Sequence, residues 1–283
     1  MVSFRKSTAV QPKGLRQVFL DQCGSIRSHY RVPLALYFLW ALIASASAHG
    51  QSRFEATVLQ VIDGDTLTLS SGETVRLAGI NTPEMARGDR PSEPLAQAAR
   101  SALESMVGGR TVQVESAPEA VDRHGRMLAY LFLPNGDLVQ TQLVKDGLAS
   151  VVAIAPNDRY LDQLVDAEDQ ARQNTRGLWG LSFYATRSPA DVTGGYQFVS
   201  GTVTRIEIGE KWFSLSLTKK LVVLIRREDW QDRFGYAIGA LDRAEIAVRG
   251  WFAQQKTRAT LVLNHPFMLE RCGIDLRRLC ESS

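Results

Sequence analysis

The stretch V-I-D-G-D-T (Val61–Thr66) joins two strand-like segments through a tight turn at Asp63-Gly64. Apolar and polar residues alternate on both sides of this turn, and a second turn at Ser70-Ser71-Gly72 leads into a third segment. Alternation with a period of two, bounded by glycine-rich turns, is typical of short antiparallel strands. The sequence from Phe54 to Ile80 is therefore predicted to form a three-stranded meander.

The pattern downstream alternates between helical and strand-like spacing. Apolar residues recur at helical spacing in Pro94–Val107, Leu138–Lys145 and Asp158–Asn174, whereas Thr111–Glu115 and Met127–Leu133 are strand-like. Five strands with packed helices predict an α+β fold that is mainly β, with a five-stranded barrel of the OB type. We expect this domain to span residues 54–184.

A second strand-rich segment follows a linker predicted at residues 185–195. We expect it to form a second small, OB-like β-barrel over residues 196–272, with a C-terminal tail at 273–283. Its expected helical stretch is Arg227–Leu241, and its expected strands are Val199–Ile208, Trp212–Leu217, Leu221–Ile225, Ile246–Trp251 and Ala259–Leu263.

Acidic and arginine side chains gather at the strand ends of the first domain. Asp63 and Asp65 flank the glycine of the first turn, and Glu84 follows a proline corner in R-L-A-G-I-N-T-P-E (Arg76–Glu84). Arg126 opens a strand in D-R-H-G-R-M-L-A-Y (Asp122–Tyr130). Carboxylates suit hard divalent cations and arginine forks suit phosphate oxygens, so the group is what phosphodiester hydrolysis requires. Each residue taken singly is more often structural.

These three stretches, in this order, resemble the staphylococcal nuclease family. The resemblance extends from Phe54 to Trp179 and includes L-V-K-D-G-L-A (Leu143–Ala149) and G-L-W (Gly177–Trp179). It implies Ca²⁺-assisted attack of water on a phosphodiester bond of DNA or RNA, with another divalent cation as an alternative. In the family pattern Asp65 and the carbonyl of Thr82 are metal ligands, and Asp63 is an acid outside the direct ligand set.

The same resemblance assigns the remaining site residues. Glu84 matches the residue that orients or deprotonates the water, and Arg76 and Arg126 match the two phosphate-holding arginines. Arg123 and His124 are candidate substrate-binding residues, although a solvated turn histidine is an equally good interpretation of His124.

Two departures from the family pattern stand out. Asn81 replaces a second metal-binding aspartate, which keeps an oxygen ligand but removes one negative charge. The base-stacking tyrosines of the family are absent from Ser150–Pro156. The protein should therefore select bases less strictly, or select them through other residues.

The first 48 residues resemble a secretory signal. Six basic residues and one acidic residue precede an uncharged apolar run that ends at Ala46-Ser47-Ala48. We expect cleavage after Ala48 and a periplasmic or secreted protein without a stable membrane partner. An uncleaved inner-membrane anchor is the alternative.

The leader accounts for the basic character of the whole chain. The formal net charge is +3, but residues 49–283 hold 27 basic and 29 acidic side chains. The first domain is acidic, and residues 196–283, with 14 basic and 10 acidic residues, are the better source of attraction to a polyanion. In this region Lys219-Lys220 and Arg226-Arg227 lie near Trp212, Phe213 and Trp230 in the sequence. These residues could form a nucleic-acid-binding surface. The alternative is that the charges are solvated and the aromatic residues belong to the core.

Cys272 and Cys280 remain in the C-terminal region after removal of the leader. A disulfide in an oxidising compartment and two free thiols are both compatible with their spacing.

The sequence thus predicts an exported, monomeric, metal-dependent nuclease. The alternative is a catalytically weak nucleic-acid or protein-binding module of the cell envelope. Retention of Asp65, Glu84, Arg76 and Arg126 favours the enzyme, and Asn81 favours the alternative.

Overall fold

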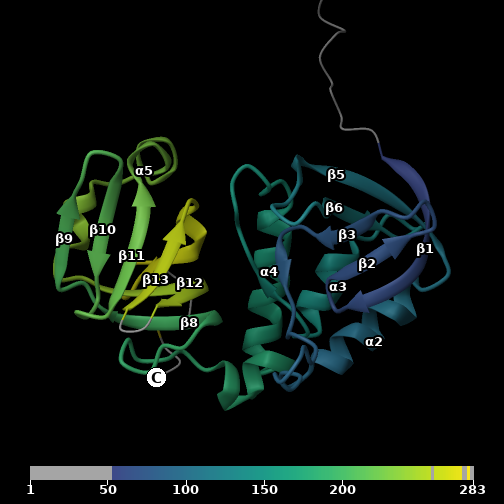
Figure 1. The fold of residues 1–283 in the computed structure, drawn as a ribbon, viewed down its shortest axis with the longest axis horizontal. Helices are drawn as coiled ribbons and strands as arrows, with labels where there is room; N and C mark the ends of the chain where they lie inside the picture. The colour runs from purple at the N-terminus through teal and green to yellow at the C-terminus, as the bar shows by residue number, and fades with distance from the viewer. Residues whose placement is uncertain (1–52, 256–257, 276–278, 281–283) are drawn as a thin grey trace, which may run out of the picture. The chain divides into compact units, whose positions relative to one another are not determined.

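The computed structural model describes residues 53–255, 258–275 and 279–280 (Figure 1). The leader predicted at residues 1–48 lies outside these residues. Among the helices of the described residues, none has the length and apolar character needed to cross a membrane.

A closed five-stranded barrel forms the N-terminal part of the described chain, which confirms the predicted fold class. Its order is β1-β2-β3-β6-β5, so the ring closes between β1 and β5. The β3–β6 pairing is parallel and every other pairing in the ring is antiparallel. The strands are β1 (Phe54–Asp63), β2 (Thr66–Leu69), β3 (Thr74–Leu77), β5 (Thr111–Val121) and β6 (Met127–Phe132).

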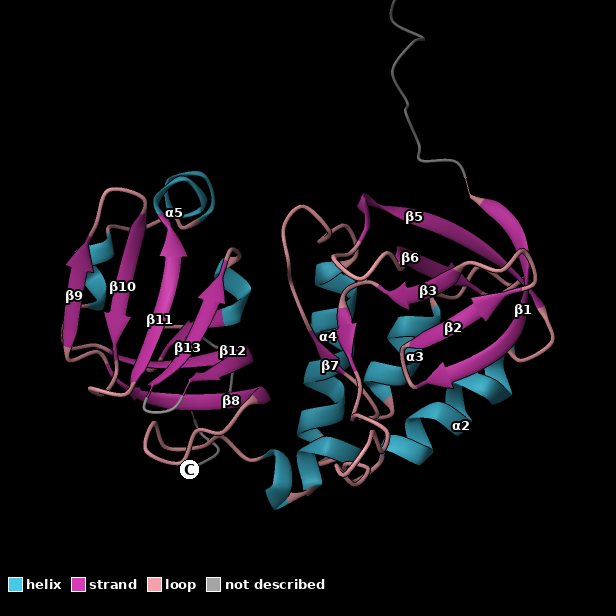
Figure 2. Cartoon of the chain, in the orientation of Figure 1, coloured by secondary structure: helices cyan, strands magenta, loops and turns pink. Residues whose placement is uncertain are grey.

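Three helices pack against this barrel (Figure 2). They are α2 (Ala96–Val107), α3 (Val139–Lys145) and α4 (Leu161–Gln173), each beginning one to three residues later than its sequence pattern indicates. In α2 the residues Ala99, Leu103 and Val107 are fully buried at helical spacing, which explains why this segment is helical.

A short ladder outside the ring connects the barrel to α4. Strand β4 (Ile80–Asn81) pairs with β7 (Ser150–Val151), and Asn81 lies opposite Ser150. The hydroxyl of Ser150 donates to the carbonyl of Asn81 over 3.4 Å. This ladder fixes the segment that carries two of the predicted metal ligands.

The C-terminal segment is a seven-stranded sheet in which β14-β12-β13-β11-β10-β9 are successive neighbours and β8 pairs with β12. The expectation was a five-stranded barrel, and the pairings among the described residues form a sheet instead. Its strands are β8 (Gly195–Thr202), β9 (Arg205–Ile208), β10 (Trp212–Ser216), β11 (Leu221–Arg226), β12 (Glu245–Gln255), β13 (Arg258–Leu263) and β14 (Leu269–Arg271).

Two details of this sheet differ from the sequence prediction. The strand expected at Val199–Ile208 is divided at Val203-Thr204, because the Val203 N–H donates to Ala244 and the Thr204 N–H to Ser216. The expected helical stretch contains α5 (Arg227–Arg233) and a separate 3-10 turn (Ile238–Leu241).

The aromatic residues of this sheet largely form its core. Trp230 is 4% exposed and stacks on Phe234 with ring centroids 4.2 Å apart, and Phe213 is also buried. The guanidinium of Arg226 lies 5.5 Å from the ring of half-buried Trp212. Of the aromatics considered for a nucleic-acid grip, Phe213 and Trp230 are therefore core residues.

A buried ion pair joins the sheet to the helix α4. Arg249 on β12 donates to both carboxylate oxygens of Glu168, over 2.9 and 2.7 Å, and to the carbonyl of Val151 over 3.3 Å. The carboxylate of Glu168 also accepts from the Val151 N–H over 2.8 Å. Gln51–Ser283 forms one compact unit.

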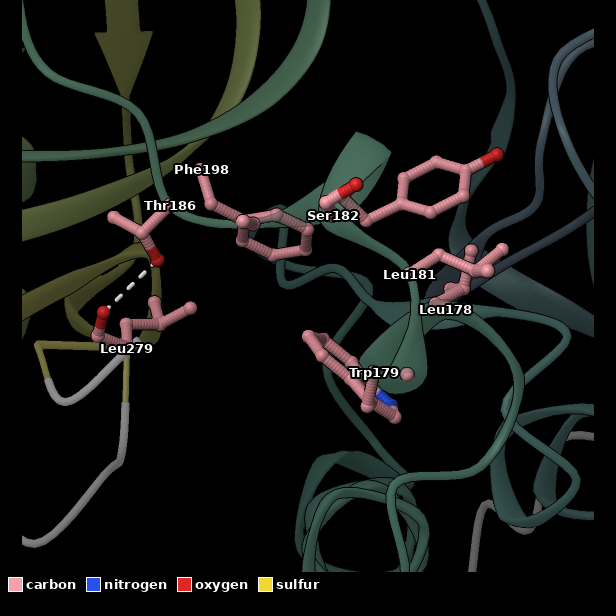
Figure 3. A pocket seen from close by; sticks show the side chains of 10 residues that line it. Leu178, Trp179, Leu181, Ser182, Thr186, Phe198 and Leu279 are labelled. Atoms are coloured by element: carbon pink, nitrogen blue, oxygen red, sulfur yellow. Dashed lines mark hydrogen bonds between the residues drawn. The ribbon is translucent and has the colours of Figure 1, made fainter. Parts of the chain in front are cut away.

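A pocket lies where Leu279 approaches Leu178, Trp179 and Phe198 (Figure 3). The hydroxyl of Thr186 donates to the carbonyl of Leu279 over 2.9 Å, and a disulfide joins Cys272 to Cys280. None of the predicted site residues lines this pocket, so it plays no part in the candidate active site.

Candidate active site

The site begins at the turn between β1 and β2, where Gly64 allows a close approach. A Cβ atom at this position would lie 2.7 Å from the Cβ of Ala99 and 2.8 Å from the Oγ1 of Thr82. Because only glycine leaves that space free, the turn can pack directly on Thr82 and on α2. The neighbouring Asp65 is thereby placed beside the segment that follows β4.

Asp65 is 2% exposed, and its carboxylate is held from several directions. The Oδ2 atom accepts from the backbone N–H and from the hydroxyl of Thr82, both over 2.9 Å. The hydroxyl of Thr66 donates to Oδ1 over 3.1 Å. A buried carboxylate with this many donors is fixed in its orientation.

Arg76 on β3 forms an ion pair with the Oδ1 atom of Asp65. Its Nη2 atom donates to the Oδ1 of Asn81 over 3.0 Å and to the carbonyl of Ile80 over 3.5 Å. Burial and, to a smaller extent, the positive charge of Arg126 lower the pKa of Arg76 to about 10. The arginine thus lies between two predicted metal ligands.

Glu84 follows Pro83 on the exposed loop after β4, and its backbone N–H donates to the side chain of Glu93 over 3.0 Å. Partial desolvation raises the pKa of the Glu84 carboxyl, and the negative charge of Asp63 adds to the effect. Arg76 and Arg126 act in the opposite direction. A carboxylate with a raised pKa is a better proton acceptor near neutral pH than an ordinary glutamate.

Arg126 precedes β6 and is held by Asp122. Its Nε and Nη2 atoms each lie 2.7 Å from the Oδ2 of Asp122, and its backbone N–H donates to Oδ1 over 3.0 Å. Desolvation raises the pKa of Asp122, but the hydrogen bonds from Arg126 and His124 outweigh it and lower the pKa overall. A third of the Arg126 side chain remains exposed, which leaves its guanidinium accessible to a substrate.

The predicted residues therefore fall into three groups. Asp65, Arg76, Asn81 and Thr82 contact one another, and the charges of Glu84, Asp63 and Arg126 act on Arg76. Arg123 and His124 lie on the exposed turn before Arg126, where the Nε of Arg123 donates to the Nε2 of His124 over 3.1 Å and the backbone N–H of His124 shares the Oδ1 of Asp122 with Arg126.

The oxygen donors suit a hard cation such as Ca²⁺. Asp65, Asn81 and Thr82 offer a carboxylate, an amide oxygen and a backbone carbonyl, all nine-tenths or more buried. The Thr82 carbonyl accepts only a long 3.3 Å bond from the Nδ2 of Asn81 among the contacts described for it. Among the described residues, no three His, Cys, Asp or Glu side chains cluster to hold a metal, so the amide and carbonyl oxygens would be needed.

Two supporting residues were not identified from the sequence as part of the site. Asp122 fixes Arg126, and Thr66 donates to Asp65. Asp122 could have been recognised, because an acid four residues before an arginine across a glycine turn is placed to pair with it. The hydroxyl of Thr66 gives no comparable signal, since threonine is common in strands.

Comparison with known proteins identifies relatives of the first part of the chain. Residues 74–180 match the family described as "Staphylococcal nuclease homologue". The chain is 32% identical over 139 residues to "Thermonuclease" of Staphylococcus intermedius, covering 48% of this chain and 80% of that protein.

Two further relatives match the same region. "Thermonuclease" of Staphylococcus hyicus is 30% identical over 125 residues, which cover 43% of this chain and 73% of the relative. "Endonuclease YncB" of Bacillus subtilis (strain 168) is 32% identical over 135 residues, which cover 46% and 64% of the two chains. The match covers 80% of the Staphylococcus intermedius protein, and the matched region forms a closed barrel. This chain therefore belongs to the staphylococcal nuclease homologue family.

Proposed function

We propose that this protein is a nuclease that hydrolyses phosphodiester bonds in DNA, RNA or both with the help of Ca²⁺. The observation that carries the proposal is the contact of Arg76 with both Asp65 and Asn81 at one end of the barrel. A guanidinium suits phosphate oxygens and these oxygen donors suit a cation, so the contact supports the proposal. The relatives named thermonuclease and endonuclease support the same activity.

The residues of this chain would divide the work as follows. Arg76 and Arg126 bind the oxygens of the scissile phosphate and stabilise the charge that develops on them. Glu84, whose pKa is raised, orients the attacking water and accepts its proton. Asp65, Asn81 and Thr82 would hold the cation, which would supply charge neutralisation at the phosphate.

Cleavage assays with the purified protein test this proposal. We expect degradation of single- or double-stranded DNA or RNA in millimolar Ca²⁺ and none after chelation with EDTA, with Mg²⁺ and Mn²⁺ as further arms. Arg76→Lys and Glu84→Gln should each lower kcat by about 10²–10³-fold while folding is retained. The matched control is Arg205→Lys, because Arg205 is 72% exposed on β9 and pairs with Glu207. Intact substrates in every metal, or equal activity in all variants, would refute a nuclease.

The alternative, a binding module of the cell envelope, is favoured by Asn81, which lowers the charge of the cation site. It predicts that the chain binds nucleic acid or a protein without cleaving either. The same assays decide between the two proposals, because the binding module leaves all substrates intact.

Export and a monomeric state complete the proposal. The Cys272–Cys280 disulfide supports an oxidising compartment, because such bonds persist in the periplasm and outside the cell. We expect the mature protein in the periplasm or medium to begin at His49, as read by N-terminal sequencing, and to have a monomer's mass by light scattering. A membrane-bound product that retains residues 1–48 would favour the anchored alternative.

A further inference from the structure

A pocket outside the ligand set has Arg76 on one wall and Trp251 of β12 on another. Its lining is mostly apolar and includes Leu128 of β6 and Ile154, with Arg76, Glu119 and Asn157 as the polar members. The residues from Arg76 at the end of β3 to Ile80 at the start of β4 also line it. The pocket is therefore continuous with the proposed phosphate-binding group.

Trp251 is unusual among the aromatic residues of the sheet because 41% of it is exposed. It lies opposite Tyr196 in the β8–β12 register, and the two rings meet edge to face with centroids 4.9 Å apart. The exposed Ile154, at 44%, lines the same pocket. An indole and an aliphatic side chain that are both exposed to water beside a charged site indicate a surface for binding a ligand.

The position of Trp251 relative to the barrel is fixed by its neighbours. Arg249, two residues earlier on the same strand, is 1% exposed and pairs with Glu168 and the carbonyl of Val151. The hydroxyl of Tyr196 donates to the same carbonyl over 3.4 Å. Because β12 is held in this way, the indole forms a preorganised wall for a ligand bound at Arg76.

The chemistry of the pocket selects its occupant. A phosphate held by Arg76 carries its sugar and base into the adjoining space, and an indole face stacks on any nucleobase. Glu119 can accept from an exocyclic amino group. Only an unpaired base can expose its face for stacking, since a duplex buries it. The segment after β7 contributes Val152 and Ile154 to the lining, so the aromatic surface comes from Trp251 of the second sheet.

Resting on the proposed function, we propose that Trp251 forms a nucleobase subsite beside Arg76 and that the substrate is therefore single-stranded nucleic acid. The subsite involves a residue outside the region that matches the family, 74–180. Stacking on Trp251 lowers KM, whereas the groups around Arg76 determine kcat.

Equilibrium binding to the full chain tests the subsite without requiring turnover. The probe is a fluorescent single-stranded oligodeoxynucleotide in EDTA, measured by anisotropy, with the matched duplex alongside. Trp251→Ala should weaken binding of the single strand by about 5- to 150-fold, the equivalent of a stacking contribution of about 1–3 kcal/mol per base. Trp251→Phe should restore most of the affinity, and an oligonucleotide with abasic sites should bind both variants and the wild type equally.

The matched control is Trp212→Ala on β10, which removes a half-buried tryptophan far from the pocket residues in the sheet order. Trp212→Ala should leave binding of the oligonucleotide unchanged. A loss of affinity equal to that of Trp251→Ala would instead indicate that the oligonucleotide binds near Trp212 and the basic residues Arg226-Arg227. If Trp251→Ala fails to fold, quenching of tryptophan emission by the oligonucleotide should still be smaller in Trp251→Phe than in the wild type.

The outcomes separate this proposal from the nuclease itself. Cleavage in Ca²⁺ with unchanged KM in Trp251→Ala, or tighter binding of the duplex, would overturn the subsite and leave the nuclease standing. Binding that depends on Trp251 without cleavage would retain the subsite and refute the nuclease. A lower oligomeric mass in Trp251→Ala would assign the surface to a second copy of the chain and also overturn the subsite.

Discussion

Arg76 and Asp65 form a buried ion pair in which the proposed phosphate-binding group and a proposed cation ligand hold each other. In the proposed function, a divalent cation at Asp65 would compete with the guanidinium of Arg76, and a phosphate at Arg76 would compete with the carboxylate of Asp65. Binding of the cation and of the anion should therefore be coupled, and such coupling is reciprocal.

Calorimetric titration with a 5′-mononucleotide measures that coupling. We expect the mononucleotide to bind about 5- to 150-fold more tightly with Ca²⁺ than with EDTA, the usual range for linked sites. In Asp65→Asn the effect of Ca²⁺ should disappear. Equal affinity with and without Ca²⁺ in the wild type would contradict the coupling.

Replacing Asn81 by aspartate should strengthen cation binding. The substitution keeps an oxygen that can accept from Arg76 and adds a negative charge to the donor set. We expect the Ca²⁺ concentration for half-maximal activity to fall by about tenfold, the equivalent of 1.4 kcal/mol. Asn135→Asp on an exposed turn is the control. An unchanged or higher Ca²⁺ requirement would show that Asn81 is not a ligand.

The close approach at Gly64 makes this position sensitive to the smallest side chain. Gly64→Ala would place a methyl group against Thr82 and Ala99, so we expect a loss of about 1–3 kcal/mol in the free energy of unfolding. Activity should fall as well, because Thr82 holds Asp65. In Gly235→Ala the new methyl group meets open space, and a stability change within about 0.5 kcal/mol is expected. Urea unfolding compares the two variants.

Breaking the ion pair of Glu168 and Arg249 should lower the free energy of unfolding strongly, whereas replacing both residues by apolar ones should lower it little. Arg249→Met removes the nearer of the two arginines that pair with the buried Glu168 carboxylate and leaves Arg172 at 3.7 Å, so we expect a loss of up to about 3–5 kcal/mol, the usual cost of breaking a buried ion pair. The double variant Glu168→Leu, Arg249→Met should recover most of that loss. The exposed pair Arg226–Glu228 is the control, and its removal should cost at most about 1 kcal/mol. A double variant no more stable than Arg249→Met would refute the pairing.

The same carboxylate gives a pH dependence with a definite sign. Burial raises the pKa of Glu168, but the charges of Arg249 and Arg172 outweigh it and hold the pKa below its ordinary value. Its contribution to stability is therefore complete above the unfolded pKa of about 4.3 and is lost as the pH falls through the lower folded pKa. Between pH 7 and pH 3 the urea midpoint should fall less in Glu168→Gln than in the wild type. An equal fall would exclude this group as the cause.

The sequence predicted the barrel well because its information is local. Turn residues such as Gly64 and period-two alternation identify the strands, and three ordered stretches identify the family and bring Asp65, Arg76, Asn81 and Thr82 together. The closure of β3 onto β6, by contrast, is a parallel pairing over about fifty residues, and the sequence leaves no local mark of it.

The second sheet was predicted less accurately, for physical reasons. Strand β14 has only three residues, Leu269–Arg271, too few to show alternation. The break between β8 and β9 depends on the partners of Val203 and Thr204, which are distant in sequence. Neither Arg249 nor Trp251 could be assigned a role, because an arginine between apolar residues on a strand indicates burial without naming its partner.

The ion pair of Arg249 with Glu168 affects which truncated forms of this protein can be stable. A chain truncated in the linker would keep Glu168 on α4 with Arg172 as its remaining ion-pair partner. It would lose Arg249, the hydrogen bond from Arg249 to the Val151 carbonyl, and the Trp251 side of the Arg76 pocket. Such a fragment would be less stable than its relatives that consist mainly of the shared domain, and its weakness would say little about catalysis. The C-terminal sheet therefore contributes to the stability of the barrel part, and removing it would change more than the residues removed.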